Sequence, residues 1–117
     1  MFEKISETYN IHYLRMDEIR WKALGSVYER LPEFAGYCGG IPFWFGLEPD
    51  DADAEPNTSA YYLCASAEPS GLLVDGYLLP EEWDRWQEAF VSLASSALGF
   101  TILAAEDDHE WPYGPVQ

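Results

Sequence analysis

The fold is decided by residues 60–99, which read AYYLCASAEPSGLLVDGYLLPEEWDRWQEAFVSLASSALG. Ala60–Ala67 and Leu72–Leu79 are rich in apolar and aromatic residues, as strands are. Between them, Glu68-Pro69-Ser70-Gly71 is a favourable β-turn sequence, with proline second and glycine last. Pro80 and the two glutamates after it are typical of a helix start, and the glycine that closes the stretch is typical of a helix end. The stretch therefore predicts a β-hairpin followed by a long helix.

Two helices are predicted, each with an apolar stripe at spacings of three and four residues, the pattern of a helix that packs on a core. In the helix after the hairpin, the stripe is Trp83, Trp86, Phe90, Leu93, Ala94, Ala97 and Leu98. The other helix is predicted over Met16–Leu31, because Asp17 and Glu18 suit its first turn and Pro32 ends it. Its stripe is Met16, Ile19, Ala23, Leu24, Val27, Tyr28 and Leu31.

Three further strands are predicted outside the hairpin. Tyr9–Leu14 alternates in a way that indicates a strand with one drier face. Residues 36–49 contain four glycines and two prolines, so they are expected to form a loop that leads into a short strand around Phe43–Leu47. Phe100–Ala105 is predicted to be the last strand.

These elements predict an α+β fold in a single domain over residues 1–117. Without the short strand, their order is β-α-β-β-α-β, which is that of a ferredoxin-like split βαβ unit. Both helices would cover one face of a mainly antiparallel sheet. The other face would be closed by aromatic side chains or would dock onto a partner.

The negative charge is concentrated in the last three-quarters of the chain. The formal net charge is −15; residues 1–30 carry five acids and five bases, whereas residues 31–117 carry sixteen acids and Arg85 as their only base. Self-repulsion on this scale destabilises a compact domain, so we expect the charge to serve solubility, metal binding or attraction to a basic partner. Because nucleic acids and anionic lipids are repelled, direct contact with either is disfavoured.

The composition indicates a folded cytoplasmic protein and not an acidic tail. The chain holds five Trp, eight Tyr and six Phe, whereas disordered acidic chains are poor in aromatic residues. We expect no signal peptide and no membrane span, since no basic segment followed by an apolar run opens the sequence. Cys38 and Cys64 show no framework spacing and are expected to be reduced thiols, with a single disulfide in an oxidising compartment as the alternative.

Two acidic clusters are candidate binding sites. The first consists of four acids in a loop expected to be exposed, Asp50, Asp51, Asp53 and Glu55. A calcium loop that starts at Asp51 would need glycine where Pro56 stands and glutamate where Tyr62 stands, so the metal-binding alternative is poorly matched. A plain solvated loop remains an alternative, and contact with a basic partner is favoured.

The second cluster follows the last predicted strand and consists of Glu106, Asp107, Asp108, Glu110 and Trp111. Acidic and aromatic side chains just past a sheet end resemble a binding rim, and the alternative is a frayed terminus. Phe43, Trp44 and Phe45 cannot all face one side of a strand, because side chains alternate. Trp44 is therefore the candidate aromatic anchor of a partner interface.

The sequence predicts no catalytic residue, no cofactor and no metal site. A zinc site built from His12, Cys38, Cys64 and His109 has no local ligand pair to support it. No nucleophile on a recognisable support and no Gly-rich phosphate loop is visible. A non-enzymatic function is therefore expected.

The chain is similar to the immunity proteins of bacterial polymorphic toxin systems, which include the partners of contact-dependent and type VI secreted toxins. The resemblance rests on the acidic, aromatic-rich character and on Tyr61–Phe100, with its hairpin around Glu68-Pro69-Ser70-Gly71-Leu72, its helix carrying Trp83 and Trp86, and its closing Leu98-Gly99-Phe100. It implies a cognate toxin that is bound tightly in the cytoplasm, with its active site covered or distorted.

A basic nuclease-type toxin is the expected partner, because nucleases grip phosphates and an array of carboxylates can imitate that substrate. The alternatives are a nucleic-acid mimic that inhibits another DNA-binding protein, and a small metal-binding domain. The mimic would need carboxylates spaced like phosphates across one face.

Overall fold

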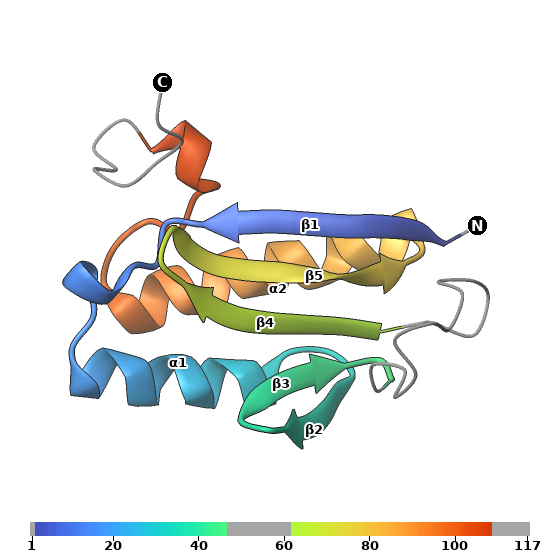
Figure 1. Ribbon diagram of the computed structural model, residues 1–117, viewed down its shortest axis with the longest axis horizontal. Coiled ribbons are helices and arrows are strands. Elements are labelled where there is room, and N and C mark those ends of the chain that lie inside the picture. The colour runs from blue at the N-terminus through green and yellow to red at the C-terminus, as the bar shows by residue number, and fades with distance from the viewer. Residues whose placement is uncertain (1, 47–61, 109–117) are drawn as a thin grey trace.

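The computed structural model describes residues 2–46 and 62–108, which form a five-stranded sheet and two α-helices (Figure 1). The strands are β1 (Glu3–Tyr9), β2 (Phe34–Cys38), β3 (Ile41–Trp44), β4 (Tyr62–Glu68) and β5 (Gly71–Leu78). The helices are α1 (Glu18–Arg30) and α2 (Pro80–Leu98), with the short 3-10 helices η1 (Tyr13–Arg15) and η2 (Ala105–Asp107). No helix within these ranges is both long and apolar enough to cross a membrane.

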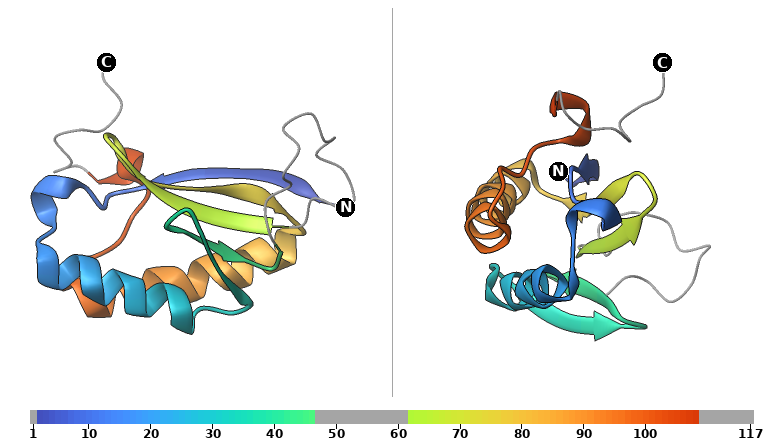
Figure 2. Two further views of the ribbon diagram at one scale, coloured as in Figure 1. Left: turned by 60° about the horizontal axis from the view of Figure 1, so that its bottom comes forward. Right: turned by 90° about the vertical axis from the view of Figure 1, so that its left-hand side faces the viewer.

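The sheet has the order β1-β5-β4-β3-β2, and all its neighbouring strands are antiparallel. Figure 2 shows both helices on one face of it, running side by side in opposite directions. The predicted α+β class, with a mainly antiparallel sheet and two helices on one face, is thus confirmed.

The predicted hairpin and both helices form where their local signals stand. β4 and β5 pair from Tyr62↔Tyr77 to Glu68↔Gly71. In α1, the Asp17 carboxylate accepts a hydrogen bond from the Arg20 backbone N–H at 2.8 Å, as an N-cap does. Pro80 begins α2, and Gly99 ends it in the left-handed conformation at φ 82°.

Three predictions about the strands were wrong in position. The first strand is Glu3–Tyr9 and not Tyr9–Leu14: the chain leaves the sheet after Tyr9, and His12 caps η1 by accepting from the Leu14 N–H. The short strand expected around Phe43–Leu47 is β3, which ends at Trp44, and the loop expected before it contains part of β2, so that the two strands form a hairpin; Leu47 lies outside the described residues. Phe100–Ala105 forms no strand but a single bridge, Tyr9↔Ala104.

The ferredoxin-like order is accordingly not confirmed. In the described ranges, four strands follow α1 before α2 begins. The chain after α2 is held by single contacts instead of a ladder: the Ile102 N–H donates to Ser95 Oγ at 2.9 Å, and the Leu103 N–H donates to Asn10 Oδ1 at 3.0 Å. Because these hydrogen bonds go to side chains and do not form a backbone ladder, this segment does not extend the sheet beside β1.

The core lies between the sheet and the two helices and is dominated by stacked aromatic rings. Trp86 stacks on Phe90, with ring centroids 5.1 Å apart, and meets Trp44 edge-on at 4.9 Å. Trp44 is fully buried and its indole N–H donates to the Tyr28 carbonyl at 3.1 Å. The expectation that Trp44 is an exposed anchor is therefore wrong, because β3 turns Trp44 to the core opposite Leu63.

Candidate partner-binding surface

Three carboxylates interact where β1 lies next to η2, and two more lie on the side of α2 that carries Gln87; we call these five the acidic edge. Its members are Glu7, Asp84, Glu88, Glu106 and Asp107. Asp84 and Glu88 are exposed on the side of α2 that also carries Gln87. The Gln87 side chain accepts a hydrogen bond from the Tyr9 hydroxyl at 3.0 Å, which places this side of α2 next to β1.

The electrostatic effect of neighbouring carboxylates is clearest at Glu7. It shares a face of β1 with Tyr9, since side chains two residues apart point the same way. Burial raises the pKa of Glu7, and the nearby charges of Glu106 and then Asp107 raise the pKa further, against a lowering by the Thr8 N–H. Residues about 100 positions apart in the sequence therefore meet in one field of negative charge.

No member of the acidic edge forms an ion pair among the described residues. The ion pairs found there join Arg15 to Asp108, Arg20 to Asp17 and Arg85 to Glu82, and none involves a member of the edge. Lys4, which also lies on β1, points toward the Tyr77 ring with its Nζ 5.7 Å from the ring centroid. The negative potential of the edge is thus left for solvent or for a partner.

The predicted site residues fall into four groups. Glu106 and Asp107 are exposed on η2 and belong to the acidic edge. Asp108 is different, because its side chain is only 11% exposed and forms an ion pair with Arg15. Trp44 belongs to the core. The others lie outside the described residues; they are Asp50, Asp51, Asp53, Glu55, Glu110 and Trp111.

Asp108 is held in a network that is centred on the buried residue Asn10. The Asn10 amide donates to Asp108 Oδ2 at 2.8 Å and to the Thr101 carbonyl at 3.0 Å. Arg15 approaches the same carboxylate oxygen at 2.8 Å. The Asn10 backbone N–H also donates to the Leu103 carbonyl at 2.9 Å. This network fixes the part of the chain from Thr101 to Asp108 against the start of the chain.

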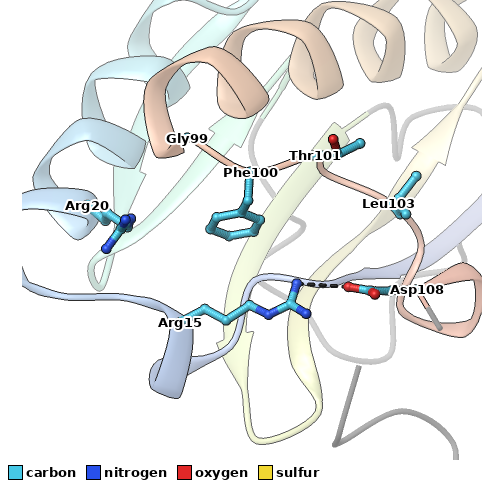
Figure 3. Close-up of a pocket in the computed structure, with 7 residues that line it drawn as sticks. All are labelled: Arg15, Arg20, Gly99, Phe100, Thr101, Leu103 and Asp108. Carbon is cyan, nitrogen blue, oxygen red and sulfur yellow. Dashed lines mark ion pairs between the residues drawn. The ribbon is translucent and has the colours of Figure 1, made fainter. Parts of the chain in front are cut away.

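A second feature, which sequence reasoning missed, is a cavity of about 430 Å³ that we call the arginine cleft. It is lined by Arg15, Arg20, Gly99, Phe100, Thr101, Leu103 and Asp108. Figure 3 shows the Phe100 ring between the two arginines, and the Arg15 guanidinium lies 5.4 Å from the ring centroid. Arg20 donates through Nε to the Leu98 carbonyl at 3.0 Å. Residues from four separate segments form this cleft, so no local sequence motif predicts it.

Exposed apolar side chains gather at the same end of the molecule. Four of the six large apolar residues exposed in the described ranges are Tyr13 (50%), Leu14 (74%), Ile19 (78%) and Leu103 (38%). Leu14 and Ile19 each adjoin an arginine of the cleft in sequence, and Leu103 lines it. Ile19 was predicted to lie in the buried stripe of the first helix, which is wrong. The exposed side chains of Ile19 and of Leu14 in η1 are the features that point to this surface.

Metal and disulfide chemistry find little support in the parts of the chain that the structure describes. No three His, Cys, Asp or Glu side chains in those parts gather closely enough to hold a metal ion. Cys38 is exposed, whereas Cys64 is buried with its sulfur 3.3 Å from the Asp75 carboxylate; both are free thiols.

Comparisons with protein-family models, with curated proteins and with solved structures found no match for this chain.

Proposed function

We propose that this chain is an acidic inhibitor of the immunity-protein type, which acts in the cytoplasm by covering a basic, nuclease-type protein toxin. The observation that carries the proposal is the acidic edge, where the charges of Glu106 and Asp107 add to the effect of burial on Glu7 and no member forms an ion pair among the described residues. A fold keeps such repulsion at a cost in stability, and attraction to a positively charged surface would offset that cost. The proposal includes no catalytic residue, no cofactor and no direct contact with nucleic acid or membrane.

The same charge suits the speed that an inhibitor needs. Complementary fields raise association rates from about 10⁵–10⁶ M⁻¹s⁻¹ toward 10⁸–10⁹ M⁻¹s⁻¹ at low salt. A toxin in the cytoplasm does damage until it is bound, so fast capture has direct value. An interface of ordinary size, about 800 Å² on each partner, would cover the acidic edge and the elements beside it.

The test is a binding measurement against the purified toxin domain encoded beside the gene for this chain. We expect a tight one-to-one complex whose association rate falls as salt rises. The double variant Glu106→Gln, Asp107→Asn is expected to lower the association rate about three- to tenfold at low salt, with little change in dissociation.

The matched control is Glu29→Gln, Glu33→Gln, which removes the same charge from the far end of α1 and the loop after it. We expect this control to leave the association rate nearly unchanged. Absence of a tight complex, or an association rate that does not respond to salt, would refute the proposed function.

A further inference from the structure

The arginine cleft differs in character from the rest of this acidic molecule. Two of the six bases in the chain line it together with the exposed Leu103, and the exposed Leu14 and Ile19 directly precede these two arginines in the sequence. Protein interfaces combine these features: their cores are enriched in aromatic residues and arginine, and their binding energy concentrates on a few anchors seated in pockets. A cavity of about 430 Å³ is at the small end of the range for ligand sites, roughly 300–1,000 Å³.

A charged ligand is poorly suited to the cleft. Arg15 pairs with Asp108 at 2.8 Å and Arg20 pairs with Asp17 at 3.2 Å, so each guanidinium already has a carboxylate. The C-terminal carbonyl of α2 at Leu98 takes a further donor of Arg20. An anion would have to displace these groups in a chain of net charge −15, and a cation would meet two arginines.

An uncharged aromatic ring suits the cleft better. The Phe100 ring and the Leu103 side chain offer apolar contact, and the Arg20 side chain keeps 42% of its exposure, so its guanidinium plane is open to stacking. The Arg20 guanidinium lines the same cavity and is a donor that suits a polar tip such as a phenol. Tyrosine, with an apolar ring and a hydroxyl group, matches this lining.

We propose that the arginine cleft is the anchor pocket for an aromatic side chain, tyrosine above all, of the protein partner. This inference rests on the proposed function, because it assigns the second half of the same interface. The two halves are continuous: Asp108 lines the cleft, and Asp107 and Glu106 directly before it belong to the acidic edge. A basic partner surface over the edge would bring its next side chains to the cleft.

The first test needs no partner protein. N-acetyl-tyrosinamide is titrated into the ¹⁵N-labelled chain and followed by NMR, with N-acetyl-aspartate as the anionic comparison. We expect saturable shifts at Gly99–Leu103 and at Arg15 and Arg20 with the tyrosine compound alone. The variant Thr101→Trp, which fills the cleft from an exposed position, should abolish these shifts, whereas Ser96→Trp on exposed α2 should keep them. Shifts of equal size with aspartate, or none at the cleft, would overturn the assignment.

The second test uses the toxin complex. Thr101→Trp and Leu103→Ala are expected to raise the dissociation rate at least tenfold without changing the salt dependence of association, and Ser96→Trp is expected to do neither. If the toxin binds and both cleft variants dissociate like the wild type, the anchor-pocket proposal is wrong while the proposed function stands. If no toxin binds, the proposed function fails, and the NMR titration alone decides whether the cleft accepts an aromatic ring.

Discussion

The acidic edge and the arginine cleft lie next to each other, and they treat charge in opposite ways. On the edge, burial raises the pKa of Glu7, and the nearby charges of Glu106 and Asp107 raise it further. In the cleft, both arginines are paired with carboxylates. Consecutive residues, Asp107 and Asp108, fall on the two sides of this division. The comparison teaches that the number of charges in a segment says less about binding than whether each charge already has a partner.

The sharpest way to test which apolar residues serve the fold is to compare Trp44 with the exposed residues around the cleft. Trp44→Ala should lower the free energy of unfolding by about 3–5 kcal/mol, because it removes a fully buried ring. Leu14→Ala and Ile19→Ala, at 74% and 78% exposure, should change the free energy of unfolding by no more than about 0.5 kcal/mol. Urea denaturation measures all three. A large loss at Leu14 or Ile19 would mean that these residues support the fold instead of a partner.

Asn10 is the connection between the two regions, so its removal should loosen both. Asn10→Ala deletes two donated hydrogen bonds and one accepted from the Leu103 N–H. We expect a loss of about 2–4 kcal/mol in the free energy of unfolding, since buried partners are left unsatisfied. Hydrogen exchange at Leu103 should also become faster. Unchanged exchange there would show that the segment after α2 is held by other contacts.

The ion pair in the cleft should be stronger than an ion pair on the surface. A double-mutant cycle with Arg15→Met and Asp108→Asn should give a coupling energy of about 1–2 kcal/mol, because Asp108 keeps only 11% of its exposure. The comparison pair is Arg85 and Glu82 on α2, where about 0.3–0.5 kcal/mol is expected. Equal couplings at the two places would remove the distinction between a paired cleft and an ordinary surface.

The smallest expected effect belongs to the acidic edge. Because the folded pKa of Glu7 lies above its usual value of 4.5, the folded state loses stability as pH rises from that value through the raised pKa. Glu7→Gln should therefore stabilise the protein at pH 7, by less than about 1 kcal/mol, and should give no gain below pH 4. Thermal unfolding at the two pH values measures this. A loss of stability at pH 7 would contradict the proposed repulsion, and Glu33→Gln is the control.

Local signals predicted those parts of the fold that depend on neighbours in sequence. The turn at Glu68–Gly71 and the start and end of α2 at Pro80 and Gly99 carry their own turn and capping chemistry. The alternation of Tyr9–Leu14 was misleading. The chain leaves the sheet after Tyr9, and the Asn10 side chain instead donates hydrogen bonds to Thr101 and Asp108 in the segment after α2. Trp44 shows a similar limit: alternation indicates that one aromatic faces away, but not which one.

The candidate site was predictable only in part, for the same reason. The sequence indicated Glu106 and Asp107 as part of an acidic cluster that follows the last predicted strand. It gave no sign that Glu7 joins them, since nearly the whole chain separates them. Asp108 has the same sequence context as Asp107, yet it is an internal partner of Arg15. Only tertiary structure separates these roles.

The aromatic stack in the core provides the molecule with an optical reporter. Trp83, Trp86 and Phe90 lie in a stacked row that meets Trp44 edge-on. Indoles held this closely in a fixed chiral arrangement should give a strong near-ultraviolet circular dichroism signal that vanishes on unfolding. No tryptophan is among the described residues that line the cleft. A tryptophan placed there, as in Thr101→Trp, would therefore add its own emission next to a core signal that reports folding.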